Sequence, residues 1–272
     1  MPTLYVVGTP IGNLEDITIR ALRVLREVQL IAAEDTRKAG ILLRHYDISA
    51  PLTSFFEANE RRKAGDILDA LAEGDVALIS DAGMPGISDP GYPLVREAIV
   101  RGYPVVPIPG PSAHTAALVI SGLPADQFMF LGFPPRKHPE QLFEGLVGIA
   151  ATLVLYEAPH RLQQTLEAML QTLGDRDIAL CRELTKMYEE VWRGRISDAL
   201  IWSEENPPRG EFTLVVAGAS GEPERWREAR VREALAMRMA EGLSRPQAAR
   251  EIAAESGWRR REIYDLVRSV IS

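Results

Sequence analysis

Residues 75–91 read DVALISDAGMPGISDPG, a short apolar run that ends in a loop rich in glycine and proline. A run with almost no polar residue is typical of a strand that is covered on both faces of its sheet. Three further runs of this kind lie near the start of the chain, at 3–8, 29–34 and 103–108. Helix-like segments separate the runs, so the pattern predicts a parallel sheet with helices on both sides.

A second α/β domain is predicted after the break GLPAD at 122–126. Four more strand-like runs follow this break, at 127–133, 152–158, 177–183 and 211–217. Some of the connections between them are short. Parallel strands need long crossovers, so we expect more antiparallel pairing in this domain.

The last fifty residues predict a small helical module. Val231, Leu235 and Met239 are spaced four apart on one helical face, and Ser244-Arg245-Pro246 has the composition of a helix start. This spacing is typical of a helix-turn-helix. We therefore predict an α/β fold of two domains, 1–121 and 126–218, followed by a helical module at 224–272.

The net charge of the chain is −7, which argues against a protein that coats polyanions without selectivity. The charge is unevenly distributed. Residues 222–272 hold 11 Lys and Arg against nine Asp and Glu, whereas the remainder holds 20 against 29. A basic tail on an acidic body is compatible with a nucleic-acid partner.

Cys181 is the one cysteine of the sequence, which excludes an internal disulfide framework and fits a reducing compartment. It lies in an apolar strand, and we expect it to be a core residue. The four histidines have no metal-ligand spacing, so no metal is expected. The chain starts without the features of a signal peptide and has no run near the ~20 apolar residues that span a bilayer. We therefore expect a cytoplasmic protein with no membrane partner.

Loops rich in glycine and proline follow four of the predicted strands, at 8–14, 80–91, 109–113 and 134–137. In open parallel sheets, ligands bind beyond the carboxyl ends of the strands. The chain has neither the glycine-rich dinucleotide motif nor a P-loop, and the prolines of these loops lack the N–H donors that cradle phosphates. The loops therefore suit a ligand without phosphates, such as S-adenosylmethionine. Rigid structural turns are the alternative interpretation.

Seven motifs carry a resemblance to a known family. They are TPIGNL at 9–14, AEDTRKAG at 33–40, SDAGMPGISDPG at 80–91, PGPSA at 109–113, YEAPHR at 156–161, RELTK at 182–186 and GEFTLVV at 210–216. Together they resemble the ribosomal small-subunit RNA (cytidine-2′-O-) methyltransferases of the tetrapyrrole methylase superfamily. The resemblance covers about the first 218 residues, and the tail resembles the helix-turn-helix extension of some members.

The resemblance implies a homodimer of two-domain chains that bind S-adenosyl-L-methionine in the cleft between the domains. It also implies 2′-O-methylation of a decoding-centre cytidine in 16S ribosomal RNA, as naked RNA or in the assembled small subunit. Methyl-donor contacts are implied at Pro10, Asp81, Gly83, Met84, Ser112, Ala113, Tyr156, Leu184 and Leu214. The family usually has threonine where this chain has Met84.

Methylation of a ribose hydroxyl, a poor acid, is helped by a general base or by a cation near the developing alkoxide. The AEDTR and RELTK motifs offer Asp35, Glu183 and Lys186 for these catalytic roles. We expect the RNA substrate to contact Asn13, Glu34, Arg37 and Arg161. The alternative interpretations are a capping cluster at a helix start for residues 34–37 and a surface ion pair for Glu183 and Lys186.

Two other functions stay open at this stage. A sibling methylase of a porphyrin-like precursor or of diphthamide would share the donor loops but lack the AEDTR and RELTK motifs and the basic tail. A DNA-binding regulator whose α/β body senses a small molecule would bind duplex DNA through the tail, without turnover. If the chain is an RNA methyltransferase or a DNA-binding regulator, Arg259-Arg260-Arg261 would contact phosphates. The alternative is that these residues form only a solvated helix face.

Overall fold

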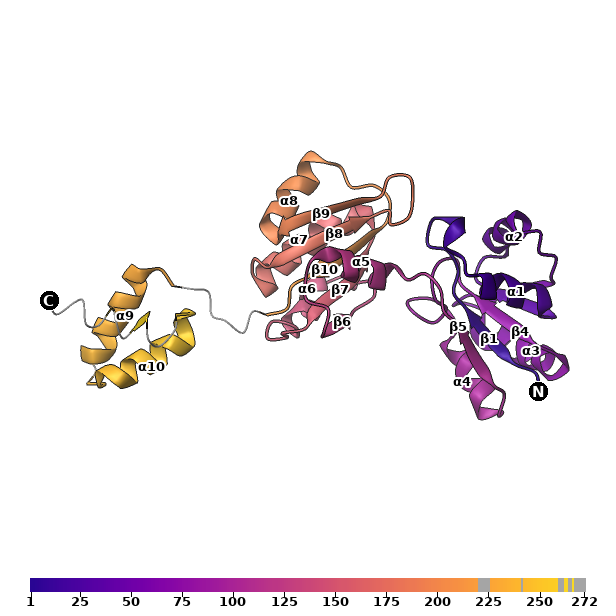
Figure 1. The fold of residues 1–272 in the computed structure, drawn as a ribbon, viewed down its shortest axis with the longest axis horizontal. Coiled ribbons are helices and arrows are strands. Elements are labelled where there is room, and N and C mark those ends of the chain that lie inside the picture. The colour runs from indigo at the N-terminus through magenta and orange to yellow at the C-terminus, as the bar shows by residue number, and fades with distance from the viewer. Residues whose placement is uncertain (220–225, 241, 259–261, 264–265, 267–272) are drawn as a thin grey trace. The chain divides into compact units, whose positions relative to one another are not determined.

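A computed structural model describes residues 1–219, 226–240, 242–258, 262–263 and 266. The chain divides into two compact units, Met1–Gly218 and Ala219–Ser272. The first unit holds two five-stranded sheets with helices on their faces, and the second is helical where it is described (Figure 1). The predicted fold class of two α/β sheets with a helical extension is confirmed.

The first sheet is entirely parallel, as the buried apolar runs predicted. Its order is β3-β2-β4-β1-β5. The strands are β1 (Leu4–Val7), β2 (Leu30–Ala33), β3 (Leu52–Ser54), β4 (Val76–Ile79) and β5 (Val105–Ile108). The sequence pattern missed β3, because this edge strand has only three residues and is partly exposed. All five strands end at the same edge of the sheet, so the loops that follow β1, β4 and β5 meet there.

Helices cover both faces of this parallel sheet because successive strand residues point to opposite sides. Ala77 and Ile79 of β4 pack into one buried cluster, and Val76 and Leu78 pack into another. On the first side lie η1 (Leu14–Asp16), α1 (Ile19–Glu27) and α2 (Thr36–His45). On the other side lie α3 (Glu60–Glu73) and α4 (Tyr92–Val100).

The second sheet is mostly antiparallel, with the order β6-β7-β10-β8-β9 and one parallel pair, β6 with β7. Its strands are β6 (Phe128–Phe130), β7 (Thr152–Glu157), β8 (Asp177–Arg182), β9 (Glu190–Arg195) and β10 (Phe212–Val216). The sequence pattern missed β9. This edge strand is polar and largely exposed, so it lacks the apolar run that marks a central strand.

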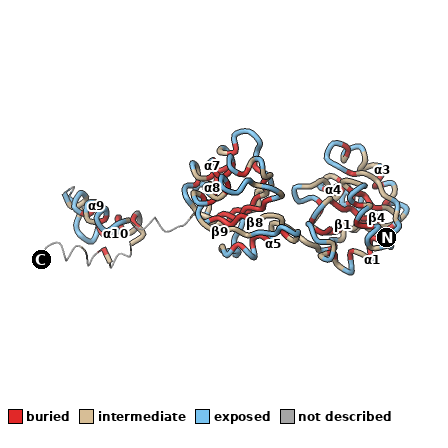
Figure 2. Tube along the Cα trace, turned by 90° about the horizontal axis from the view of Figure 1, so that it is seen from above, coloured by how far each residue is buried: buried red, intermediate tan, exposed pale blue. Residues whose placement is uncertain are grey.

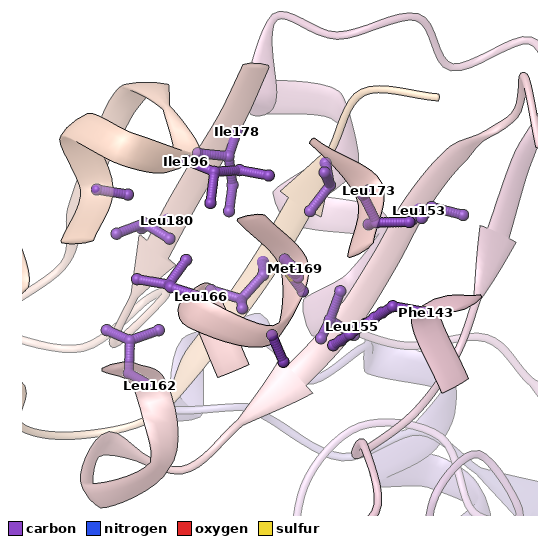
Figure 3. Close-up of a cluster of buried hydrophobic side chains, with 14 of the residues drawn as sticks. Phe143, Leu153, Leu155, Leu162, Leu166, Met169, Leu173, Ile178, Leu180 and Ile196 are labelled. Carbon is purple, nitrogen blue, oxygen red and sulfur yellow. The ribbon is translucent and has the colours of Figure 1, made fainter. Parts of the chain in front are cut away.

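One face of the second sheet carries the largest buried cluster of the chain's described part (Figure 3). Three α-helices contribute to it, α6 (Pro139–Glu144), α7 (Leu162–Leu173) and α8 (Ile196–Glu205), with the short η2 (Pro159–Arg161) before α7. Figure 2 shows that buried residues follow the strands of both sheets.

The opposite face of the second sheet is covered by α5 (Ala113–Ser121), which packs on β7, β8 and β10. Ala117 and Leu118 of α5 contact Val154, Cys181 and Val215. Residues 113–121 therefore belong by packing to the second sheet, although the predicted first domain ends at 121. Because both sheets fall in one compact unit, the boundaries 1–121, 126–218 and 224–272 stay predictions.

The second unit contains α9 (Glu228–Ala240) and α10 (Arg245–Ser256) around a small apolar core. Ser244 precedes α10, and its N–H donates to the side chain of Gln247 at 3.1 Å, which satisfies a group at the helix start. Val231 and Leu235 are buried as expected. Arg259-Arg260-Arg261 lies outside the described residues. Among the described helices of both units, none combines the length and apolar character that a bilayer crossing requires.

Leu166 offers a test of the second-sheet core, because its side chain is fully buried in the cluster of Figure 3. We expect Leu166→Ala to lower the free energy of unfolding by about 2–5 kcal/mol, through lost burial and the cavity it leaves. Ile201→Ala on α8 is the control, since Ile201 is 56% exposed, and it should cost about 0.5 kcal/mol or less. Urea unfolding followed by Trp192 and Trp202 fluorescence measures both, and equal losses would contradict the packing.

Candidate functional site

A cavity of about 450 Å³ lies where the loops of the first sheet face the second sheet. One wall comes from the segments after β1, β2, β4 and β5, and includes Ile11, Asp81 and Ser112. The other wall comes from the second sheet and includes Tyr156 and Lys186. The volume is in the range of pockets that hold a small organic ligand or cofactor.

Backbone contacts without intervening side chains join the three loops that follow β1, β4 and β5. Thr9 and Gly83 exchange two hydrogen bonds, with N···O distances of 2.9 and 3.0 Å. A Cβ on Gly8 would lie 2.7 Å from Cα of Gly110, so neither position has room for a side chain. Gly83 has φ +75°, a conformation that favours glycine. These contacts therefore hold the three loops rigidly together, and of the residues that make them, Gly83 lines the cavity.

The wall of the first sheet is negatively charged. Glu34, Asp81 and Asp89 all line the cavity, and Lys38 is the one cation lining this wall. The Asp81 carboxylate accepts a hydrogen bond from Lys38 Nζ at 2.7 Å and from Asp35 N–H at 3.0 Å. Burial raises the pKa of Glu34, and burial together with the nearby Glu34 charge raises the pKa of Asp89 to about 6. Three carboxylates facing one amine favour a cationic ligand.

An aromatic group forms part of the opposite wall. His114 Nδ1 lies 3.0 Å from Ser112 Oγ and 3.2 Å from the Tyr156 hydroxyl. The His114 ring also packs on Phe130, with ring centroids 4.5 Å apart. Burial lowers the pKa of His114, so the imidazole is neutral at pH 7 and acts as a hydrogen-bonding partner.

The RELTK motif places a lysine at the edge of the cavity. Lys186 Nζ lies 2.9 Å from Glu183 Oε1 and 2.8 Å from Glu211 Oε2. Partial burial lowers the pKa of Lys186, but hydrogen bonds to Glu211 and Glu183 outweigh it, and the pKa is raised. The amine therefore stays protonated at neutral pH.

Strained backbone fixes the position of this lysine. Glu183 and Thr185 are non-glycine residues with φ of +49° and +66°. Asn13 N–H donates to Thr185 Oγ1 at 3.1 Å, which ties the loop after β1 to the RELTK loop. Gly12 also leaves room for Lys186, because a Cβ there would meet Lys186 Cγ. Such strain persists where surrounding contacts determine the geometry, and it clusters at functional sites.

The structure brings nine of the predicted site residues to the cavity. They are Glu34, Asp81, Gly83, Met84, Ser112, Ala113, Tyr156, Leu184 and Lys186. Met84, which stands at the usual threonine position, packs over Gly8: its Sδ would lie 2.8 Å from a Cβ there. Methionine is therefore accommodated by the close approach of the loops.

The other predicted site residues do not line the cavity. They are Pro10, Asn13, Asp35, Arg37, Arg161, Glu183 and Leu214. Glu183 is linked to the cavity through its ion pair with Lys186, which does line it. The Leu214 side chain lies in the core cluster on the far face of its sheet, and Thr213 lines the cavity instead, because adjacent strand residues alternate.

Three of these residues have structural partners in the fold, namely Asp35, Arg37 and Arg161. Asp35 is the N-cap of α2, and its carboxylate accepts hydrogen bonds from the backbone and side chain of Arg37. Those hydrogen bonds hold the pKa of Asp35 far below its usual range. The capping-cluster interpretation of these two residues therefore fits the geometry. Arg161 donates to the carbonyls of Pro134 and Pro135 instead of facing the cavity.

The sequence analysis did not assign several of the lining residues to the site, among them Lys38, Asp89, His114 and Phe133. Lys38 and Asp89 lie inside quoted motifs, AEDTRKAG and SDAGMPGISDPG. His114 and Phe133 gave no local signal, because their role depends on Tyr156, which is far away in the sequence.

A profile of the Tetrapyrrole (Corrin/Porphyrin) Methylases matches residues 3–200. The chain is therefore a methylase of this class, and its paired sheets with a cavity between them agree with that assignment. Ribosomal RNA small subunit methyltransferase I of Halalkalibacterium halodurans is 46% identical over 271 residues, which cover 97% of this chain and 94% of the relative. The chain belongs to the family of ribosomal RNA small subunit methyltransferase I, and the resemblance seen in its motifs is confirmed.

Relatives of the same name differ in length. The Bacillus subtilis protein is 44% identical over 97% of this chain and 94% of its own. The Thermotoga maritima protein is 50% identical over 220 residues, 80% of this chain and 99% of its own. About a fifth of this chain therefore has no counterpart in that shorter relative.

Solved structures share the fold at low sequence identity. A uroporphyrin-III-C-methyltransferase from Thermus thermophilus has a TM-score of 0.58 and 24% identity over 80% of this chain and 95% of its own. A diphthine synthase has a TM-score of 0.60 and 15% identity over 79% of this chain and 89% of its own. At such identities the likeness shows the fold alone.

The raised pKa of Asp89 predicts a pH-dependent gain in stability for Asp89→Asn. Its folded pKa of about 6 exceeds the ordinary 3.8, so ionisation destabilises the fold progressively as pH rises through this window. We expect the free energy of unfolding of the variant to match that of the parent near pH 4. Above pH 7 it should be higher by about 1 kcal/mol, a value that allows for the partial exposure of this carboxyl.

Thermal unfolding at pH 4.5 and pH 8 measures the effect of Asp89→Asn. Asp66→Asn is the matched control, because the Asp66 side chain is 69% exposed on α3. A variant that is less stable than the parent at pH 8 would contradict the negative wall.

Proposed function

We propose that the chain transfers a methyl group from S-adenosyl-L-methionine to the ribose 2′-hydroxyl of a decoding-centre cytidine in 16S ribosomal RNA. The observation that carries the proposal is that the protonated Lys186 and the glycine-rich loops share one cavity. A methyl donor held by the loops would therefore lie close to a cation that can act on an oxygen nucleophile. The names of the full-length relatives support ribosomal RNA of the small subunit as the acceptor.

The residues of the cavity fit the donor. S-adenosylmethionine carries a sulfonium and an ammonium, and Glu34, Asp81 and Asp89 supply negative charge on one wall. The close contact of Gly8 with Gly110 holds together the β1 and β5 loops, which contribute Ile11 and Ser112 to the cavity lining. When bound, the donor supplies a methyl group activated by its sulfonium. Asp81, Gly83, Met84, Ser112, Ala113, Tyr156 and Leu184 would hold it.

Lys186 would act on the acceptor hydroxyl through its charge. A fixed cation beside an oxygen stabilises the negative charge that develops as the hydroxyl loses its proton. Lys186 itself is a poor proton acceptor, because its pKa is raised. Burial raises the pKa of Glu183, but the hydrogen bond from Lys186 outweighs it and the pKa is lowered. Glu183 therefore orients the amine better than it would accept a proton, and the proton of the hydroxyl passes to solvent water as the methyl group is transferred.

The proposed acceptor is the assembled small subunit or its RNA. The enzyme is proposed to act on it as a homodimer in the cytoplasm. An acidic body attracts RNA weakly, which favours selection by shape and by local contacts. Large apolar side chains stay exposed on α5 at Val119 and beside Lys186 at Met187 and Tyr188. Such surfaces support association with a second copy or with the ribosome. Asn13 and Arg37 would face the RNA from the rim of the cavity.

Methyl transfer from labelled S-adenosylmethionine tests the proposal. Small ribosomal subunits, naked 16S RNA and a porphyrinoid precursor are compared as acceptors, and the labelled nucleoside is identified. Label on the 2′-oxygen of a cytidine in subunit RNA is expected. Label on the porphyrinoid alone would assign the chain to the small-molecule methylases that share its fold.

Lys186→Ala tests the assignment of the cation. We expect turnover at saturating RNA to fall about 100-fold, because the developing oxyanion loses its counter-charge. The dissociation constant of the donor should change less than twofold, since the negative wall remains. Lys63→Ala on α3 is the matched surface control and should leave both values unchanged. Parallel losses of donor binding and turnover in the Lys186 variant would give this lysine a structural role.

A further inference from the structure

The loop after β6 presents an aromatic ring to the cavity. Phe133 lines the cavity and is 55% exposed, so it is not a core residue. Its ring contacts Tyr156 on one side, with centroids 5.4 Å apart. Tyr156 in turn packs edge-on against Phe130, at 5.0 Å. The Phe133 ring is therefore supported from behind and still has surface open to a flat ligand.

A largely buried ionic group holds this loop in place. Arg161 Nη2 donates to the carbonyls of Pro134 and Pro135, both at 2.9 Å. Arg161 Nε lies 3.6 Å from the carboxylate of Glu157, whose side chain is completely buried. The Glu157 carboxylate also accepts hydrogen bonds from Ala158 N–H and from the hydroxyl of Thr165.

Burying a carboxylate and a guanidinium is unfavourable unless the pair makes good hydrogen bonds. Here the guanidinium directs its hydrogen bonds to two successive proline carbonyls of a surface loop. Proline also restricts φ, so the loop has little conformational freedom. Tyr156 N–H adds a hydrogen bond to the carbonyl of Gly132 at 2.9 Å. Rigidity of this kind is expected of a loop that must hold a ring in a defined position.

The same loop continues into two exposed cations, Arg136 and Lys137. Within the described ranges of the chain, neither has an ion pair or a side-chain hydrogen bond. They stand out because the body of the chain is acidic. An aromatic face followed by free cations is the combination that recognises single-stranded nucleic acid, with the ring stacking a base and the cations meeting phosphates.

We propose that Phe133 is the stacking platform for the cytosine of the acceptor nucleotide, an assignment that rests on the proposed function. Arg136 and Lys137 contact the neighbouring phosphates, and Arg161 is a positioning residue that holds the loop. A ribose hydroxyl enters so small a cavity only when its nucleotide leaves the base stack. The extruded base then needs a new stacking partner, and Phe133 supplies it on the second-sheet wall, opposite the carboxylates that suit the donor.

Three substitutions of Phe133 test the platform. Phe133→Ala removes the ring, Phe133→Leu keeps apolar volume without a flat face, and Phe133→Tyr keeps the face. With small subunits and labelled donor, the alanine and leucine variants should lose 10- to 100-fold in kcat/KM for RNA. The tyrosine variant should stay within threefold of the parent. Donor affinity, measured by equilibrium dialysis, should change less than twofold in all three.

Arg161→Lys tests the positioning role, because arginine uses Nε beside Glu157 and Nη2 for both proline carbonyls, whereas the single nitrogen of lysine cannot occupy both places. It should reproduce the kcat/KM loss of Phe133→Ala at unchanged donor affinity, and combining the two should add little. Arg136→Ala with Lys137→Ala should raise KM for RNA and reduce its salt dependence, and an unchanged KM would remove these two cations from the RNA contact.

Four outcomes would overturn the platform. If Phe133→Ala weakens donor binding and leaves KM for RNA unchanged, the ring contacts the methyl donor and not the base. Equal kcat/KM for the leucine and tyrosine variants would reduce Phe133 to an apolar contact. A parent protein that places no label on small-subunit RNA would remove the proposed function and the platform together, whereas an active parent with a fully active alanine variant removes the platform alone.

Discussion

The close approach of two backbones, at Gly8 and Gly110, is the constraint on which the site depends. A Cβ on Gly110 would lie 2.8 Å from Cα of Gly8, so the loops after β1 and β5 can meet only without side chains. The Thr9–Gly83 bridge adds the loop after β4 to the same contact. Because the parallel strands end at one edge, this contact holds the three loops together, and Ile11, Gly83 and Ser112 from these loops line the cavity.

Charged groups lie on both walls of that cavity. The first-sheet wall carries Glu34, Asp81 and Asp89 with Lys38, and on the second-sheet wall Lys186 lies beside Glu211. Carboxylates on one wall and a lysine on the other suit a reaction in which a cationic donor meets an oxygen that becomes negative. The strained backbone around Lys186 and the buried charge on Arg161 serve the same end, since both hold a group in place that would otherwise move in solvent.

The sequence alone predicted the parallel first sheet, the more antiparallel second sheet and the family, because central strands are apolar runs and the motifs are contiguous. Edge strands escaped it, since β3 is short and β9 is polar. It also placed residues 113–121 with the first sheet, although α5 packs on the second. A helix that follows a strand in the chain is free to pack on either sheet, and only long-range contacts decide between them.

For the site, the sequence by itself determined the residues that lie in contiguous motifs, such as Asp81, Gly83 and Ser112. Only the tertiary structure separated Lys186, which lines the cavity, from Arg161, which holds a loop. Only the tertiary structure also brought Phe133 and His114 to Tyr156. The physical reason is that a motif specifies local backbone and composition, whereas the direction of a side chain and its partner depend on segments far apart in the chain.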